Sequence, residues 1–312
     1  MAITASDVKA LREKTGVGMM ECKKALVEAE GDMDKAIDFL RERGLAAAQK
    51  KATRIAAEGV VLPYYDKATK KGVIIEVNSE TDFVAKNEKF MSFVEGTAKT
   101  VLAENPADVE ALKEAKFNGT DRTVTETLND LVLAIGENMK IRRFERMDGI
   151  VATYIHAGGS VGVMVGFDVA DEAKADDAEF VAMGKNVAMQ IAAMKPAYLD
   201  EASVPADVVE HEQGILAAQM KEDPKMANKP EAVLVKIAAG KMGKYYKENC
   251  LVEQEFVRGD LFQGSVKGYV DSVAKALGTE IKVNGYICMI KGEGLEKREE
   301  NFAEEIAKQI NG

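Results

Sequence analysis

An internal repeat at a constant offset of 90 residues limits the fold of this chain more than any other feature. Glycine and aromatic residues recur in register: Gly59 with Gly149, Tyr64 with Tyr154, Gly72 with Gly162, and Phe90 with Phe180. Apolar positions between them follow the same offset without a gap. A match sustained over this length indicates a duplicated structural unit. Chance agreement between strands rich in valine and glycine is the alternative.

Each copy of the repeat is typical of two strands followed by a helix. The β-branched runs cover 60–65 and 72–78 in the first copy, and 150–155 and 162–169 in the second. A helix is expected to begin near the matched phenylalanine of each copy. Units of this kind predict an α+β fold with two related antiparallel-sheet-plus-helix subdomains.

A small helical module precedes the repeat. Three helices separated by glycine-bearing turns are expected there: one capped by Ser6 or Thr4 and ending at Gly16, one over 19–29, and one capped by Asp32 and ending at Gly44. Their apolar spacing predicts a compact three-helix bundle. The stretch 45–57, rich in alanine and lysine, predicts a helical linker.

The segments outside the repeat are mostly helical. A helix over about 124–140, with Gly136 inside it, is expected after the first copy. After the second copy, helices over 206–222 and 231–243 with a proline-bearing turn predict a projecting helical hairpin. The tail predicts a helix at 266–277, a strand at 281–290 and a last helix at 302–310.

Charge and composition restrict the partners of the chain. Its 312 residues hold 42 Lys and Arg against 52 Asp and Glu, a net charge of −10. This balance argues against a nucleic-acid binder, which needs cations against the phosphates, and against docking on an anionic membrane. Three cysteines without a Cys-x-x-Cys pair indicate a reducing compartment. Without a signal peptide or a bilayer-spanning apolar run, a cytoplasmic location is expected.

The usual sequence signatures of catalysis and cofactor binding are missing. The chain has two histidines, His156 and His211, and carries no nucleophile elbow, zinc-protease helix or P-loop. Gly16-Val17-Gly18 lacks the third glycine of a dinucleotide fingerprint. We therefore predict a protein that is not an enzyme and that binds no cofactor or metal of its own.

The segment Thr81-Asp82-Phe83-Val84-Ala85-Lys86-Asn87 stands where the repeat needs only a connecting loop. In one interpretation, Phe83 and Val84 pack beneath the sheet and Asp82 caps the next helix. In the other, the Phe83 ring is a wedge for a partner's pocket, beside a carboxylate that competes for a cation or a backbone donor. The second copy has only a featureless acidic stretch here, over 171–176, and this divergence favours a function.

Three further places are candidate contacts with a partner. Gly136 either marks a close backbone approach within the chain or, as a contact, would let a partner helix lie directly on the helix that carries Ile135. His156 follows the first strand of the second copy and is either a surface loop residue or a partner contact, because no other ligand stands at metal-binding spacing. Beside a glycine turn, one of Met19 and Met20 is expected to pack inward and to leave the other as an adaptable contact.

Several of these segments resemble the bacterial elongation factor Ts family. The resemblance is carried by Ile3-Thr4-Ala5-Ser6, by 11–26, by 32–40, by Glu76-Val77-Asn78 with Thr81 through Asn87, by Ile135-Gly136-Glu137-Asn138 and by Gly292 through Lys297. Several motifs of this length occur in the same order along almost the whole chain. The sequence departs from the family pattern in the glycine-rich residues after His156 and at Glu255, where a proline is expected.

The resemblance implies a guanine nucleotide exchange factor for the GTPase elongation factor Tu, bound in its GDP and nucleotide-free states. It implies that magnesium is dislodged from the GTPase by Thr81, Asp82, Phe83 and Val84. The other implied contacts are Lys9, Arg12, Met19, Met20, Ile135, Gly136 and His156. Two other functions stay open at this point: an adaptor that uses the N-terminal module to bind proteins, and a hydrolase that uses Asp82.

The resemblance also implies the domain organisation. The parts are a ubiquitin-associated-like helical module (1–54), a core N-subdomain (55–145), a core C-subdomain (146–202 and 240–290), a coiled-coil hairpin (203–239) and a C-terminal helical module (291–312). The hairpin is the candidate surface for a homodimer.

Overall fold

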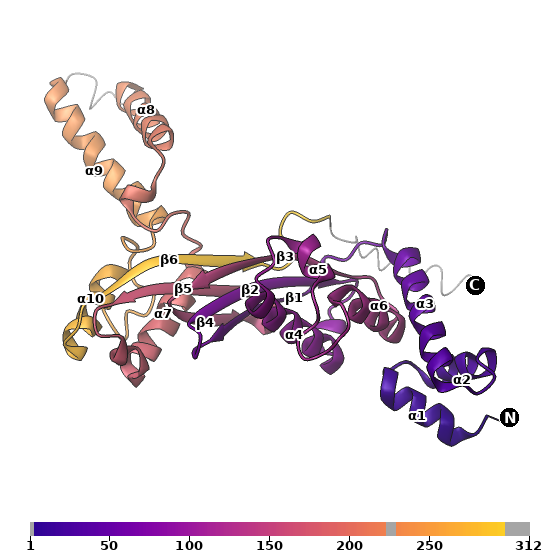
Figure 1. Ribbon diagram of the computed structural model, residues 1–312. Helices are drawn as coiled ribbons and strands as arrows, with labels where there is room; N and C mark the ends of the chain where they lie inside the picture. Colours follow the sequence, from indigo (N-terminus) through magenta and orange to yellow (C-terminus); the bar gives the residue numbers. More distant parts are fainter. Residues whose placement is uncertain (1–2, 223–228, 297–312) are drawn as a thin grey trace.

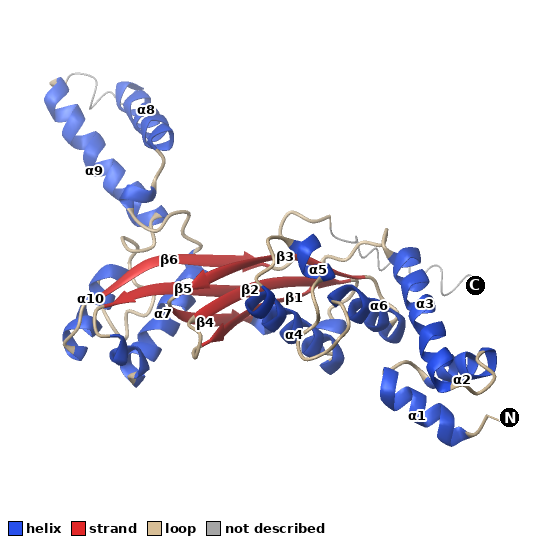
Figure 2. Ribbon diagram, viewed as in Figure 1, coloured by secondary structure: helices blue, strands red, loops and turns tan. Residues whose placement is uncertain are grey.

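The computed structural model describes residues 3–222 and 229–296, and its centre is a pair of three-stranded antiparallel sheets (Figure 1). The strand order is β1-β2-β3 in the first sheet and β4-β5-β6 in the second. The strands are β1 (Glu58–Asp66), β2 (Lys71–Ser79), β3 (Met139–Asp148), β4 (Ile150–His156), β5 (Val161–Val169) and β6 (Ile281–Ile290). The predicted α+β class is confirmed. Figure 2 shows the strands gathered in the middle of the molecule with the helices around them.

The offset of 90 residues is a structural duplication. Matched features at this offset are helices α4 (Glu88–Glu104) and α7 (Ala178–Met194), β-bulges after Glu76 and Gly166, and the left-handed residues Asn105 and Lys195 that end the two helices. Chance matching of apolar residues does not reproduce backbone details of this kind. The alternative of coincidence is therefore wrong.

The two sheets pack face to face, and helices cover their other faces. Helix α4, with α5 (Val109–Glu114) and α6 (Val124–Ile135), covers the first sheet, while α7 and α10 (Val266–Leu277) cover the second. Because side chains alternate along a strand, Val60 faces the helices and Val61 faces the other sheet. The buried centre of the contact between the sheets is formed by Val61, Ile74, Val151, Met164 and Met289. Each such buried side chain contributes about 1.5–3 kcal/mol.

The helix predicted over 124–140 is wrong at its end. Helix α6 stops at Gly136, whose φ of +89° is left-handed, and β3 begins shortly afterwards at Met139. Gly136 therefore caps the helix instead of lying inside it, because glycine adopts this conformation without a Cβ penalty. Strand β3 then continues across the expected subdomain boundary between residues 145 and 146.

The N-terminal module consists of three packed helices, α1 (Ala5–Thr15), α2 (Met19–Glu28) and α3 (Met33–Lys51). Of the two expected caps of α1, the structure uses Thr4. The expected end of the third helix at Gly44 is wrong, since α3 continues to Lys51. A Cβ at Gly44 would stand 3.3 Å from the carbonyl oxygen of Asn129, so glycine serves the close approach of α3 to α6.

Helices α8 (Ala206–Glu222) and α9 (Glu231–Asn249) pair as a hairpin that projects from the sheets (Figure 1). Helix α8 has its expected bounds, whereas α9 continues beyond the expected end at 243. Helix α10 and strand β6 also have the bounds expected from the sequence. The expected last helix at 302–310 lies outside the described residues. None of the described helices combines the length and apolarity needed to cross a membrane.

Candidate partner-binding site

The loop Thr81–Val84 connects β2 to α4, and its two adjacent apolar side chains lie in different environments. Phe83 is 78% exposed, whereas Val84 is 4% exposed and belongs to the core beneath the first sheet. The interpretation that packs both side chains beneath the sheet is therefore wrong for Phe83. Burial of Val84 holds the loop against the sheet and leaves the ring in solvent.

Asp82 stands beside this ring and is also exposed. The cap of α4 is Asn87, whose Oδ1 accepts the backbone N–H of Lys89 at 2.9 Å, so Asp82 does not cap the helix. The Asp82 carboxylate forms only an exposed ion pair with Lys86 at 3.9 Å. Such surface pairs contribute little free energy. The carboxylate and the ring are therefore both exposed to solvent.

The base of the loop is fastened to the turn that follows α6. The Glu137 carboxylate accepts the hydroxyl of Thr81 at 2.7 Å and its backbone N–H at 3.0 Å. In return, the Glu80 carboxylate accepts the backbone N–H of Asn138 at 2.6 Å. Hydrogen bonds to an ionised group are stronger than neutral ones. Two segments that the sequence marks separately are thereby brought together.

Ile135 ends α6 close to the start of α4. It is half-buried and shares a hollow of about 510 Å³ with Ala134 and residues 87–89. Gly136 is exposed, and no atom lies within 4 Å of the position a Cβ would take. A glycine is therefore required here by the left-handed φ and not by a close contact within the chain.

The N-terminal module meets the same region through the turn between α1 and α2. The Lys89 ammonium group, at the start of α4, donates to the carbonyl oxygen of Gly16 at 2.6 Å. Thr15 and Gly16 also line a groove together with residues of α4 and α6. This contact fixes the turn between α1 and α2 at the start of α4.

Four predicted contact residues lie on the surface of that module. Met19 and Met20 are 44% and 65% exposed, so the expectation that one of them packs inward is wrong. Val17 is buried instead and fills the core of the module at this turn. Lys9 and Arg12 of α1 are exposed as well.

His156 is exposed and is the last residue of β4, not the residue after the strand. Its Nδ1 lies 3.1 Å from the hydroxyl of Tyr154. The turn η2 (Ala157–Gly159) that follows packs on Val60 of β1. Strand β1 also contacts η1 (Val84–Lys86), the end of the loop. The turn after His156 and the end of the loop Thr81–Val84 therefore both contact strand β1.

Sequence reasoning misses the environment of Glu76, which is fully buried in β2. Its carboxylate accepts hydrogen bonds from Asn78, Arg142, Arg143 and Gly292. Burial acts to raise the pKa of Glu76, but these hydrogen bonds outweigh it and hold the pKa below its ordinary value. One signal in the sequence could have identified this residue. Glu76 is a single charged residue within an apolar strand, and the matched position of the second copy is Gly166.

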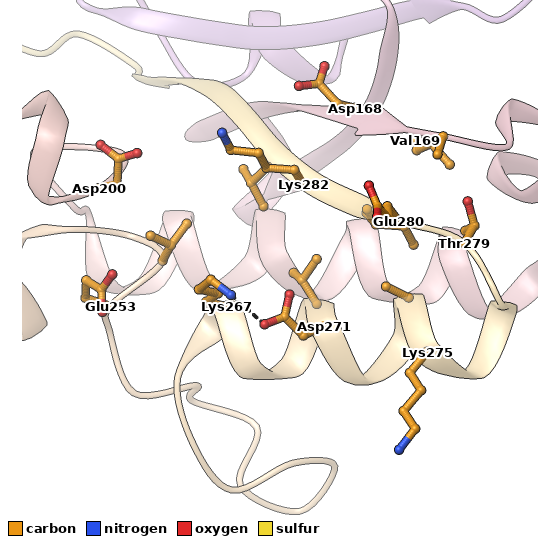
Figure 3. A pocket seen from close by; sticks show the side chains of 16 residues that line it. Asp168, Val169, Asp200, Glu253, Lys267, Asp271, Lys275, Thr279, Glu280 and Lys282 are labelled. Carbon is orange, nitrogen blue, oxygen red and sulfur yellow. Dashed lines mark hydrogen bonds and ion pairs between the residues drawn. The ribbon is translucent and has the colours of Figure 1, made fainter.

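A hollow of about 850 Å³ lies elsewhere, between α10 and the start of β6 (Figure 3). Lys267 and Asp271 pair at its edge at 2.6 Å, and none of the predicted contact residues lines it. Helix α10 and the N-terminal helices lie at opposite ends of the molecule (Figure 1). Over residues 3–222 and 229–296, no cluster of three His, Cys, Asp or Glu could hold a metal ion. This hollow is therefore not part of the predicted contact region.

Comparisons with known proteins agree over almost the whole chain. The model of the family described as Elongation factor TS matches residues 80–293. An elongation factor Ts from Syntrophotalea carbinolica is 47% identical over 311 residues, 98% of this chain and 99% of that protein. One from Magnetococcus marinus is 45% identical over 315 residues, 100% of both chains, and one from Clostridium kluyveri is 46% identical over 99% of both. These matches do not favour the adaptor alternative.

Proposed function

Because the chain belongs to the elongation factor Ts family, we propose that it releases GDP from elongation factor Tu with the loop Thr81–Val84. Members of this family are the nucleotide exchange factors of that GTPase. Exchange needs no catalytic group in the exchange factor, only a surface that binds the empty GTPase more tightly than the GDP-bound one. By linkage, the exchange factor then weakens GDP by the same factor.

The free energy required is moderate. A change of about 10⁴-fold in GDP affinity corresponds to about 5.5 kcal/mol of differential binding. An interface of roughly 1,600 Å² supplies this if a few of its contacts are incompatible with bound nucleotide. The magnesium ion that bridges the phosphates is an effective target, because its coordination geometry is strict and phosphate binding depends on it.

The observation that carries the proposal is the exposed Phe83 ring on a loop with a fixed base. Val84 is buried and Thr81 is bound to Glu137, so the loop is ordered before any partner arrives. A preordered loop loses little conformational entropy on insertion. In this proposal the ring enters the GTPase beside its nucleotide, and the Asp82 carboxylate repels phosphate or competes for magnesium.

The other predicted residues surround this wedge in the proposal. Ile135, Gly136 and His156 contact the GTPase next to the loop. The exposed residues of the N-terminal module bind its nucleotide domain: Lys9, Arg12, Met19 and Met20. The hydrogen bond from Lys89 to Gly16 supports this arrangement, since it fixes the module beside the start of α4.

Release of a fluorescent GDP from purified elongation factor Tu tests the wedge. The wild-type chain should accelerate release at sub-stoichiometric amounts. The variant with Asp82→Ala and Phe83→Ala should still form the complex. Its rate of GDP release should be at least about 30-fold lower than that of the wild type, which is the effect of losing one hot-spot contact. Val181→Ala, at an exposed apolar position of α7, is the matched control. Equal release by the double variant and the wild type would discard the wedge.

We infer the remaining properties from the same family membership. The N-terminal module is of the ubiquitin-associated-like type, and the α8–α9 hairpin is the coiled-coil insertion. The chain acts in the cytoplasm, catalyses no chemical reaction, and binds both the GDP-bound and the nucleotide-free GTPase. Ile215 and Val233 are exposed on the hairpin and give a homodimer an apolar contact. Sedimentation should show a dimer that Ile215→Ser with Val233→Ser dissociates, and a monomeric wild type would contradict it.

A further inference from the structure

Glu76 binds groups from three separate parts of the chain. Its Oε1 accepts the Asn78 amide at 3.0 Å, Nη1 of Arg142 at 3.0 Å and the backbone N–H of Gly292 at 2.7 Å. Its Oε2 accepts Nε of Arg143 at 2.7 Å. These five residues, from β2, β3 and the segment after β6, are called the Glu76 cluster below. One carboxylate thus joins the end of the second sheet to the first.

A β-bulge explains how two successive arginines reach the same carboxylate. Glu76 pairs with Arg143 and Val77 pairs with Ile141, which leaves Arg142 as an extra residue on β3. Neighbouring residues of a regular strand point to opposite faces. The bulge interrupts this alternation and re-aims a side chain. Both guanidinium groups therefore approach the carboxylate from β3.

The matched bulge in the second sheet works without any buried charge. Gly166 takes the position of Glu76, and Asn284 is the extra residue on β6. The duplicated sheet therefore does not need a carboxylate at its bulge. Buried ion pairs are also weak contributors to stability, because removing charges from water costs several kcal/mol. The presence of the Glu76 cluster in the first copy alone indicates a role beyond forming the sheet.

The segment after β6 lies close against the first sheet. Gly292 has a left-handed φ of +66°, and a Cβ there would clash with the carbonyl oxygen of Ala57. The second guanidinium nitrogen of Arg142 donates to the carbonyl oxygen of Glu293. This segment is therefore held by its backbone, at a site that admits only glycine.

Hydrogen bonds continue from the Glu76 cluster to the proposed wedge. The Asn78 amide that donates to Glu76 also donates to the carbonyl oxygen of Glu58 at 3.0 Å, which fixes the start of β1 to the end of β2. Next along the chain, the buried Ser79 donates its hydroxyl to the carbonyl oxygen of Thr81 at 2.8 Å. The loop thus follows two residues at the end of β2, Asn78 and Ser79, whose side chains are both hydrogen-bonded.

We propose that Glu76 is a positioning residue for nucleotide exchange. By holding the segment after β6 on the first sheet, the Glu76 cluster fixes the strand end from which the loop Thr81–Val84 projects. The inference rests on the proposed function of that loop. It adds that the geometry of the loop depends on Gly292, which lies 216 residues beyond Glu76 in the chain.

Two glycine substitutions test the Glu76 cluster without removing a charge. Gly292→Ala pushes the backbone away from Ala57 and from Glu76, whereas Gly294→Ala imposes similar left-handed strain, at φ +72°, with no atom within 4 Å. We expect Gly292→Ala to lower the maximal rate of GDP release about tenfold and to speed amide hydrogen exchange over 79–83. Gly294→Ala should stay within about twofold of the wild type in both measurements.

A double-mutant cycle separates positioning from a general loss of stability. If the Glu76 cluster acts through the loop, Gly292→Ala should change the rate by less than about twofold in the Phe83→Ala background. Glu76→Gln should likewise change the rate by less than about twofold in the Phe83→Ala background. If Glu76→Gln does not fold, Gly292→Ala alone provides the test. Effects that multiply in the double variant would overturn the inference, as would equal behaviour of Gly292→Ala and Gly294→Ala.

The two proposals fail in different ways. Amide exchange over 79–83 needs no GTPase, so it reports on the Glu76 cluster independently of exchange activity. Faster amide exchange in Gly292→Ala without a change in GDP release would overturn the positioning role alone. A wild-type chain that leaves GDP release unchanged would overturn the proposed function, and the positioning role with it.

Discussion

The hydroxyl group of Thr81 donates to one oxygen of the Glu137 carboxylate at 2.7 Å, and the backbone N–H of Thr81 donates to the other at 3.0 Å. A single side chain from the turn after α6 therefore fixes both the backbone and the side chain of the first loop residue. The loop and the Ile135–Gly136 turn are connected as one unit, although 56 residues separate the two partners in sequence.

Glu137→Ala should weaken this connection. Loss of two charge-assisted hydrogen bonds at a half-buried site should lower the free energy of unfolding by about 1–3 kcal/mol. Release of fluorescent GDP should slow by about tenfold, because the loop is no longer held in one conformation. Glu145→Ala, at an exposed position of β3, is the control. Equal GDP release by the two variants would show that Glu137 does not support the loop.

Lys89→Met should act on binding more than on the maximal rate. It removes the hydrogen bond to Gly16 but leaves the loop Thr81–Val84 intact. The concentration of the chain needed for half-maximal GDP release should rise about fivefold, which corresponds to about 1 kcal/mol. Lys185→Met, at an exposed lysine of α7, should leave this concentration unchanged. A fall in the maximal rate alone would contradict a role of Lys89 in orienting the N-terminal module.

Adjacent glycines test whether the His156 turn is fixed on β1. Gly158 and Gly159 are both left-handed, with φ of +65° and +96°. Gly158→Ala should cost about 1–2 kcal/mol of unfolding free energy from backbone strain alone. Gly159→Ala should cost about 3 kcal/mol or more, because its methyl group also clashes with Val60. Urea unfolding measures both values, and equal costs would show that the turn does not pack on β1.

The buried carboxylate of Glu76 predicts a loss of stability in acid. Its pKa in the folded chain lies below the ordinary value of 4.5, so its contribution is present above that value and is lost as the pH falls through the folded-state pKa. Glu76→Gln should lower the free energy of unfolding by about 3 kcal/mol near neutral pH. The difference from the wild type should shrink as urea unfolding is repeated at lower pH. A difference independent of pH would contradict an ionised Glu76.

The duplicated core was predictable from the sequence because its signals are local. Strands with one buried face repeat their apolar residues with a period of two, and glycine marks the turns between them. Helices α4 and α7 were found for the same reason, since each begins just before a matched phenylalanine, Phe90 or Phe180. The duplicated spacing reinforced each of these signals with a second copy.

Strand β3 was missed because its pattern is not apolar. Six of its ten residues are charged, and such residues favour a helix as readily as a strand when read alone. Glu76 lies opposite Arg142 and Arg143, at the bulge of β2, and accepts hydrogen bonds from both guanidinium groups inside the fold. A pairing of this kind depends on tertiary structure, and the periodicity of apolar residues along one segment does not indicate it.

The loop was located correctly, but the orientation of its side chains could not be predicted. Phe83 and Val84 are adjacent apolar residues, and either could have filled the space beneath the sheet. The short turn η1 begins at Val84, which places that side chain inward and its neighbour outward. Asn87 rather than Asp82 then caps α4, and this choice too depends on where the helix begins.

A phenyl ring kept in water contributes nothing to the folding of its own chain. The free energy of covering such a ring, about 2 kcal/mol, is gained only when another molecule surrounds it. In the proposed function, the folding stability of the free protein and its effect on the GTPase therefore depend on two different residues of this loop. Val84 contributes to folding through its burial, whereas Phe83 acts on the GTPase in the proposed function, so either property can be altered while the other is left in place.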